Sequence, residues 1–422
     1  MDNGPPRGTR DLLPDSVARR EAVMAELAGS YARFGFRRIE TPCIEDLSRL
    51  SWGEGGDNEK LIYKILRRGL DPVVAAGTAL GDLVDLGLRY DLTVPLTRFY
   101  ANNAGKLPLP FRAMQIGPVW RAERPQRGRF RQFTQCDIDT VGEPSVLAEA
   151  ELLEATLTAL GAIGIEGVTV RVNDRRLLAA LAAEVGVSES ALRAFYVILD
   201  KLDKIGWNGV RDELVEQGHS GAVGGRCEQI VSLISGAGSP DGAIARAADL
   251  LPGMAESVLT ELRETFDALS RVEAAAPPGA LTACLDTTVV RGMGYYTGQI
   301  FELAHPDAPS AIAGGGRYDD LVGRSLGKKV PACGISIGFD RVVEMARFAP
   351  PDLGVALLHS AEVPRWEVLE MARRVRLEGD SATLVSRRGQ LKVQLATLQS
   401  AGYSSFVVVE PGGVSERRPL RG

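Results

Sequence analysis

Six charged residues crowd a short segment between two β-rich runs. The runs, residues 111–120 and 130–141, have strand-like composition, and the polar segment between them contains glycine and proline, which predicts a long hairpin. The charged residues fall within eleven positions: Arg121, Glu123, Arg124, Arg127, Arg129 and Arg131. Arginine suits a planar, two-pronged grip on phosphate or carboxylate, and no lysine is used here. The segment is therefore either a solvated hairpin tip or an anion-binding loop held by rigid strands.

Three later segments combine glycine with tyrosine or arginine. Residues 290–298 hold three glycines and two tyrosines, which suits close approach of a ligand or a bulged strand with core tyrosines. Residues 313–319 include three consecutive glycines, which we do not expect in a core and which suit either a phosphate or a tight turn. Residues 334–341 predict a glycine-bearing strand that runs into a helix with Arg341 in its first turn.

These segments together indicate one site for an anionic ligand. The arginines that would meet a triphosphate are Arg121, Arg291 and Arg341. Acidic residues also accompany them, namely Asp91, Glu123 and Asp139. These carboxylates would either pair with the arginines or bind a cationic, hydrogen-bonding substrate, for which an ammonium and an imidazole are suitable groups.

Helices and strands alternate along most of the chain. Helices are predicted at 16–34 and 145–163, and strands at 36–42, 87–90, 168–172, 281–286, 289–291, 299–303 and 332–337. Residues 175–272 are rich in Ala, Leu and Glu with helical periodicity, which predicts a helical insertion. After the proline pair at 350–351, strands at 354–358, 381–385 and 404–409 alternate with helices at 363–378 and 390–401. The last residues, SERRPLRG, are predicted to be frayed.

Composition narrows the class of protein. The chain has 422 residues, 45% of them hydrophobic, and a formal charge of -5, so we expect two or three globular domains with local basic patches rather than a basic nucleic-acid coat. Five cysteines form no C-x-x-C pair, which disfavours zinc and a disulfide framework. Five lone thiols suit the reduced cytoplasm, where we expect the protein. The first ten residues lack the apolar core of a signal peptide, and no run of about 18 apolar residues occurs, so no membrane span is expected.

The chain resembles histidyl-tRNA synthetases over nearly its whole length. FGFRRIETPCIE (34–45), FRAMQIGPVWRAERPQRGRFRQFTQCDID (111–139) and ACGISIGFDR (332–341) resemble motifs 1, 2 and 3 of class II synthetases. VVRGMGYYTGQIFE (289–302) and AGGGRYDDLV (313–322) are similar to the two signatures specific for the histidyl branch. PRGTRDLLP (6–14), LRYDLTVPLTRFY (88–100) and ILDKLDKIGW (198–207) also fit.

The resemblance implies an α+β fold in which helices flank an antiparallel catalytic sheet. It divides the chain into core segments 1–174 and 273–348, a helical insertion at 175–272, and a short anticodon-binding-like α/β domain at 351–422. It also implies a homodimer through motif 1, with ATP, Mg²⁺, L-histidine and tRNA(His) as cofactors and partners. No metal ligand from a protein His or Cys is expected.

The resemblance also assigns roles to individual residues. Arg121 and Arg291 would be catalytic, and ATP would be bound by Arg121, Glu123, Arg129 and Arg341. Histidine would be bound by Asp91, Thr93, Gln135, Asp139, Arg291, Tyr295, Tyr296 and Tyr318. Within that set, Asp91, Thr93 and Gln135 would hold the ammonium, and Asp139 and Tyr296 the imidazole. Gln126 and Arg131 would touch the acceptor end of tRNA.

Two departures from the family leave alternatives open. Family members commonly have Asp where this chain has Gly294, and the C-terminal domain is short. One alternative is a paralogue that makes an aminoacyl-adenylate for another acceptor. The other is a regulatory subunit of an ATP phosphoribosyltransferase, although such proteins usually lose the motif arginines that stand here.

Overall fold

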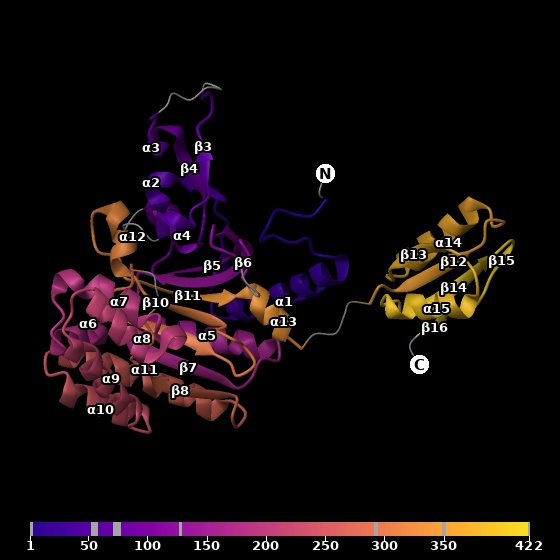
Figure 1. Ribbon diagram of the computed structural model, residues 1–422. Helices are drawn as coiled ribbons and strands as arrows, with labels where there is room; N and C mark the ends of the chain where they lie inside the picture. Colours follow the sequence, from indigo (N-terminus) through magenta and orange to yellow (C-terminus); the bar gives the residue numbers. More distant parts are fainter. Residues whose placement is uncertain are drawn as a thin grey trace. The chain divides into compact units, whose positions relative to one another are not determined.

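The computed structural model describes residues 3–51, 58–70, 77–125, 129–290, 294–347 and 352–420 (Figure 1). The chain forms two compact units: residues 1–11 with 23–347, and residues 12–22 with 348–422. In the part of the chain that the structure describes, no helix has the length and apolar character needed to cross a membrane.

An eight-stranded, mainly antiparallel sheet forms the centre of the larger unit. In spatial order, its strands are β1 (Arg37–Arg38), β5 (Phe111–Trp120), β6 (Gln132–Val141), β11 (Ala332–Gly338), β10 (Ala313–Arg317), β9 (Gln299–Ala304), β7 (Val168–Asp174) and β8 (Leu281–Leu285). Only the outer pairs, β1 with β5 and β7 with β8, are parallel. The expected antiparallel sheet flanked by helices is therefore confirmed.

Strand alternation gives the sheet one aliphatic face and one polar face. Ile138 of β6 lies opposite Met114 of β5 and Ile335 of β11, and all three are buried in the main core. The preceding residue of β6 points to the other face, because side chains alternate along a strand. There Asp137 lies opposite Gln115 and Ser336.

Helices cover the aliphatic face. α1 (Pro14–Arg33), α5 (Leu147–Ala162), α11 (Glu256–Ala275) and α13 (Phe339–Met345) contribute buried side chains to the same core as the sheet. α4 (Thr93–Asn103) and α12 (Asp319–Leu326) form a second, smaller core with the ends of β5, β6 and β11. The polar face between these helices and the loops is left for a ligand.

A small sheet holds the segment before α4 in place. It consists of β2 (Ile44–Asp46), β4 (Val84–Leu88) and β3 (Lys64–Leu66), with short helices α2 (Leu47–Leu50) and α3 (Leu80–Leu83) beside β4. Arg89 follows β4, is only 4% exposed, and donates to the carbonyls of Thr41 and Pro118 at 2.7 and 2.9 Å. Gln115 donates to the carbonyl of Leu92 at 2.9 Å. These bonds fasten residues 89–93 over the polar face.

Six helices follow β7 before the chain returns as β8. They are α6 (Arg175–Glu184), α7 (Leu192–Leu199), α8 (Leu202–Glu216), α9 (Gly221–Ser235), α10 (Pro240–Leu250) and α11. Their apolar residues join the core of the sheet rather than forming a separate one. α8 is kinked at Gly206, which has a φ of 64° that favours glycine.

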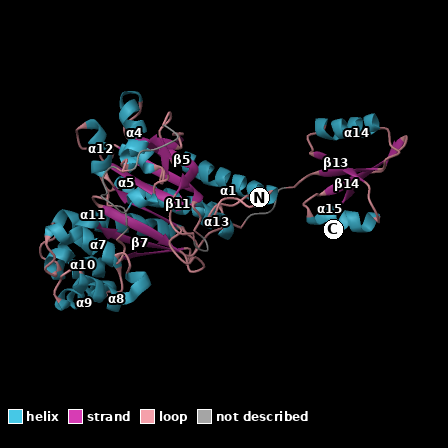
Figure 2. Ribbon diagram, turned by 45° about the horizontal axis from the view of Figure 1, so that its top comes forward, coloured by secondary structure: helices cyan, strands magenta, loops and turns pink. Residues whose placement is uncertain are grey.

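The C-terminal unit is a small α/β layer structure (Figure 2). Its sheet contains β12 (Val355–His359), β13 (Ala382–Ser386), β14 (Ser405–Glu410), β15 (Gly413–Val414) and β16 (Arg418–Pro419). α14 (Arg365–Leu377) packs on Val355 and Leu357, and α15 (Leu391–Ser400) packs with Ala356 and Leu358. Neighbouring residues of β12 therefore point to opposite faces, each covered by one helix.

Three sequence predictions need correction. Residues 314–316 are not a turn: they lie in the buried central strand β10, where an added Cβ on Gly315 would come within 1.9 Å of the carbonyl oxygen of Gly334. Valines 289 and 290 are not in a strand, and Arg291 lies outside the described residues. Residues 415–420 are not frayed, because β16 pairs with β14 and Leu420 packs against the C-terminal core.

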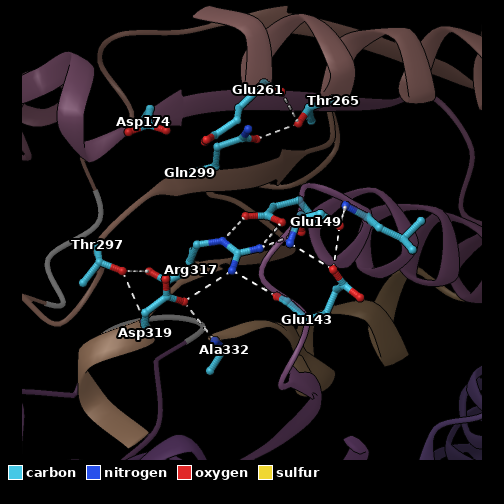
Figure 3. Close-up of polar contacts among 12 residues, drawn as sticks. Glu143, Glu149, Asp174, Glu261, Thr265, Thr297, Gln299, Arg317, Asp319 and Ala332 are labelled. Atoms are coloured by element: carbon cyan, nitrogen blue, oxygen red, sulfur yellow. Dashed lines mark hydrogen bonds and ion pairs between the residues drawn. The ribbon is translucent and has the colours of Figure 1, made fainter. Parts of the chain in front are cut away.

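Arg317, the last residue of β10, is fixed by a buried ion pair (Figure 3). Its Nε and Nη2 donate to the two carboxylate oxygens of Glu149 in α5, both at 2.6 Å. Asp319 accepts from Nη1 of Arg317 at 3.3 Å and from the backbone N–H of Ala332 at 2.9 Å. Because both neighbours of Tyr318 are anchored, its side chain has a defined position on the polar face.

We predict that Arg317→Met strongly destabilises the larger unit. Glu149 is 2% exposed, so losing its partner would leave a buried carboxylate uncompensated, at a cost of about 3–5 kcal/mol in the free energy of unfolding. The thermal midpoint followed by circular dichroism should drop accordingly. Arg317→Met combined with Glu149→Leu should recover most of the loss.

The control breaks an exposed pair. The side chains of Arg263 and Glu256 are 43% and 75% exposed, so Glu256→Gln should change stability by less than about 1 kcal/mol. Equal effects of Arg317→Met and Glu256→Gln would contradict a structural role for the buried pair.

Candidate functional site

A cavity of about 220 Å³ opens on the polar face of the central sheet. It is lined by the following residues predicted from sequence: Asp91, Thr93, Arg121, Gln135, Asp139, Tyr295, Tyr296, Tyr318 and Arg341. They come from β6, α13, the first turn of α4 with the residues before it, the loop before β9, and the residues that directly follow β5 and β10. The structure thus brings together residues that are up to 250 positions apart in the sequence, since Asp91 and Arg341 share the cavity.

One end of the cavity is acidic. Asp91, Asp137 and Asp139 line it, and each is at most 3% exposed. Asp91 accepts from the backbone N–H of Val94 at 3.1 Å, which places it at the start of α4. Asp137 was missed by the sequence analysis. Its position between Gln135 and Asp139 could have identified it, because residues at i, i+2 and i+4 of one strand share a face.

Burial raises the pKa of both strand carboxyls. Burial raises the pKa of Asp139 to about 7. The Tyr318 hydroxyl donates to Oδ1 of Asp139 at 2.5 Å, and this hydrogen bond partly offsets the effect by lowering the pKa. The pKa of Asp137 is raised well above its ordinary value by burial and by the charge of Asp139, and is lowered by hydrogen bonding with Ser336. Oδ1 of Asp137 and Oδ2 of Asp139 are buried and have no hydrogen-bond partner among the described residues.

Aromatic rings surround Asp139. The ring centroids of Tyr295 and Tyr296 lie 4.8 Å apart, and those of Tyr295 and Tyr318 lie 5.9 Å apart. Glycine leaves the room for this arrangement, because a Cβ on Gly334 would come within 1.9 Å of Oδ1 of Asp139. A flat ring with an N–H group fits between such partners.

The other end of the cavity is basic. Arg121 donates to the carbonyl of Tyr90 at 3.1 Å, and its guanidinium lies 5.0 Å from the ring centroid of Phe133. Nη1 of Arg341 donates to the carbonyl of Ala311. Burial, together with the nearby charge of Arg129, lowers the pKa of Arg341. Phe133 was also missed by the sequence analysis, although it lies on the same strand face as Gln135.

A second cavity, of about 230 Å³, adjoins the basic end. Arg121, Phe133, Gly338 and Arg341 line both cavities, and Glu123 and Arg129 line the second. Charged atoms of Glu123 and Arg129 are 3.9 Å apart, and both side chains are about half exposed. All four residues predicted for a nucleotide therefore line this cavity, which has an aromatic face and several cationic groups.

An N-terminal segment holds the hairpin loop beside this cavity. Arg10 pairs with Asp340 at 2.7 Å and lies over the ring of Phe130, 4.1 Å from its centroid. Arg131 donates through its backbone N–H to the carbonyl of Gly8 at 2.7 Å, and through Nε to the carbonyl of Glu123 at 3.0 Å. The Arg131 side chain, predicted to touch tRNA, is thus engaged at the base of the loop.

Two predicted residues, Gln126 and Arg291, lie outside the described residues. The chain just before Arg291 is nevertheless fixed. Asn173 donates to the carbonyl of Val289 at 2.8 Å, and Arg175 donates to the carbonyl of Val290 at 3.3 Å. Gly298 accepts from the backbone N–H of Arg175 at 3.0 Å. The segment that contains Arg291 therefore begins and ends on the β7–α6 junction.

The geometry suits a zwitterion next to a phosphate chain. Carboxylates at one end can bind an ammonium and an N–H of a ring, and arginines at the other can bind a carboxylate and phosphates. Within the described ranges, no group of three or more His, Cys, Asp or Glu is placed to bind a metal ion. Substrate positioning by charge and hydrogen bonds is the chemistry that these residues can perform.

Comparisons with known proteins agree on one family. A model of the histidyl-tRNA synthetase family matches residues 8–342. The chain is 44% identical to the histidine–tRNA ligase of Leifsonia xyli, over 99% of the chain and 98% of the relative. It is 38% identical to that of Aeropyrum pernix, over 94% and 86%. The crystal structure of histidyl-tRNA synthetase from Nostoc sp. PCC 7120 matches with a TM-score of 0.76 at 26% identity, covering 97% of this chain and 92% of that one.

We predict that Asp139→Asn gains stability relative to the unchanged protein as pH rises. The native pKa of about 7 lies above that of an unfolded carboxyl, about 3.9, so the native state binds the extra proton between these values. Stability is therefore lost from pH 4 to pH 7 in the unchanged protein and not in the variant. Between pH 4 and pH 7, the unfolding free energy of Asp139→Asn minus that of the unchanged protein should grow by about 3–4 kcal/mol. Thermal midpoints of both proteins at several pH values would measure this change. Parallel curves would contradict the prediction.

Proposed function

The chain belongs to the histidyl-tRNA synthetase family, and we propose that its sheet-face cavity is where histidine reacts with ATP and is then passed to tRNA(His). The chain is a histidine–tRNA ligase, as 44% identity over almost the full length of a relative of that name indicates. The observation that carries the residue-level proposal is the single cavity shared by the acidic and basic groups. A regulatory subunit or a paralogue with another acceptor is not favoured.

Histidine would lie with its imidazole at the aromatic end. Asp139 and Tyr296 would bind the ring, with Tyr295 and Tyr318 beside them. Asp91, Thr93 and Gln135 would hold the ammonium. A pocket with buried polar groups matched to imidazole rejects apolar amino acids, because those groups would be left unpaired.

ATP would lie across the basic end and the adjoining cavity. Arg121 and Glu123 would hold the α-phosphate and the adenine side, and Arg129 and Arg341 the outer phosphates. Arg291 would contact the α-phosphate and the histidine carboxylate. Aminoacyl-tRNA synthetases use ATP by reaction type. Magnesium would arrive bound to the phosphates of ATP, where it would neutralise charge on the departing pyrophosphate.

Catalysis of this reaction would depend on positioning the substrates and stabilising charge, and no side chain would form a covalent intermediate. In the first step the histidine carboxylate attacks the α-phosphorus, and Arg121 and Arg291 stabilise the charge that develops there. In the second step a ribose hydroxyl of tRNA attacks the carbonyl carbon of the adenylate. Gln126 and Arg131 would lie near the acceptor end, and residues 351–422 would contact the anticodon arm. The proposed domain limits remain those given by the sequence.

We expect the purified protein to catalyse histidine-dependent exchange of pyrophosphate into ATP, and to charge tRNA(His) when it is added. Arg121→Ala should lower the exchange rate by about 10²–10³-fold, because a group that stabilises the transition state is removed. Arg263→Ala, on an exposed face of α11, is the matched control and should keep full exchange. Exchange without charging would favour the paralogue, and absence of exchange with any amino acid would overturn the proposed function.

We also propose a cytoplasmic homodimer formed through residues 34–45. Ile44 in this segment is 47% exposed in the single chain, which suits a surface that a second copy covers. Light scattering should give twice the chain mass of 45.2 kDa, and Ile44→Asp should shift it toward the monomer. A monomeric mass for the unchanged protein would contradict this assembly.

A further inference from the structure

Asp137 is a buried carboxylate of the cavity to which the family resemblance assigns no role. It occupies the middle of β6, is 3% exposed, and lines the cavity. In the strand register it lies opposite Gln115 on one side and Ser336 on the other. It therefore faces the substrate side of the sheet, halfway between Gln135 and Asp139.

Of the polar groups around Asp137, the Ser336 hydroxyl hydrogen-bonds with its carboxylate, whereas the Gln115 and Gln135 amides are engaged in other contacts. The Gln115 amide donates to the carbonyl of Leu92 at 2.9 Å, and the Gln135 amide donates to the hydroxyl of Ser336 at 2.8 Å. Oδ1 of Asp137 is fully buried and has no hydrogen-bond partner among the described residues. A buried carboxylate oxygen of this kind carries a large desolvation penalty unless a donor reaches it.

The charges of the cavity favour a cation at this point. Asp137 lies near two other carboxylates, Asp91 and Asp139, which disfavour its ionisation. Asp139 already accepts from the Tyr318 hydroxyl, and its surroundings are aromatic. Arg121 is the cation that lowers the pKa of Asp137, and it is needed at the phosphate end. An ammonium between Asp91 and Asp137 would give Asp137 a donor and relieve the repulsion between the two carboxylates.

We propose that Asp137 binds the α-ammonium of histidine together with Asp91, and so acts as a further substrate-binding residue. The inference rests on the proposed function, since it names one more contact of the same substrate. Asp137 is two residues before Asp139 on the same face of β6, in the direction of Gln135. A histidine whose ring contacts Asp139 would therefore place its ammonium near Asp137. Histidine and analogues that carry an ammonium would make the contact with Asp137, whereas analogues that lack the ammonium would not.

The test uses Asp137→Asn in the full chain. The variant keeps the size of the side chain and removes the charge. In pyrophosphate exchange we expect the KM for histidine to rise at least tenfold and the KM for ATP to change less than twofold. Asp286→Asn is the matched control: Asp286 pairs with Arg171 at 2.7 Å on the same sheet but does not line the cavity, so both KM values should stay unchanged.

Two inhibitors separate a direct contact from a structural role. Histidinol keeps the ammonium and the imidazole, whereas imidazolepropionate lacks the ammonium. Asp137→Asn should weaken inhibition by histidinol at least tenfold and leave inhibition by imidazolepropionate within twofold. Equal weakening of both inhibitors, or an unchanged KM for histidine in an active variant, would overturn the role of Asp137 and leave the proposed function standing. Loss of exchange in the unchanged protein would overturn the proposed function itself.

Discussion

Three aspartates are buried against one face of an antiparallel sheet, and several features of the larger unit reduce the free-energy cost of burying them. Carboxylates in such a place are costly unless they are hydrogen-bonded, paired or protonated. Tyr318 donates to Asp139, and the ion pair of Arg317 with Glu149 fixes the backbone on which Tyr318 stands. Gly334 gives Asp139 the room that any larger residue would take. The same features that reduce the cost of burial also shape a pocket for an N–H-bearing ring.

The basic end of the site is positioned by backbone contacts from distant parts of the chain. Residues 7–10 hold the base of the hairpin loop through Arg131 and Phe130, and Asp340 links Arg10 to the backbone N–H of Thr134. Arg341 lies in the first turn of α13, directly after the central strand β11. Because both arginines of the cavity are tied to backbone carbonyls, their guanidinium groups are oriented before a ligand arrives.

The sequence was sufficient to predict most of the fold and many of the residues that line the cavity. The predicted strand at 111–120 coincides with β5, and helix predictions at 145–163 and 390–401 fall within two residues of α5 and α15. These elements have clear periodicity and clear ends. The resemblance to a family located residues such as Asp91 and Arg341, which no periodicity could have placed in one cavity.

The failures have physical causes. Consecutive glycines at 314–316 were not expected in a core, because composition does not reveal that neighbouring strands approach too closely for a Cβ. Asp137 was not predicted because motif comparison considers residues one by one, whereas its position on the cavity face follows from strand alternation. The extent of the small sheet and the pairing of β16 depend on long-range contacts, which local patterns do not encode.

The most direct measurement is a crystal structure of the protein with a stable analogue of histidyl-adenylate. We expect the imidazole between Asp139 and the tyrosines, the ammonium against the acidic end, and the adenosine in the cavity lined by Phe133 and Arg341. Binding of the analogue at another place, or with its ring away from Asp139, would contradict the assignment of this sheet face as the active site.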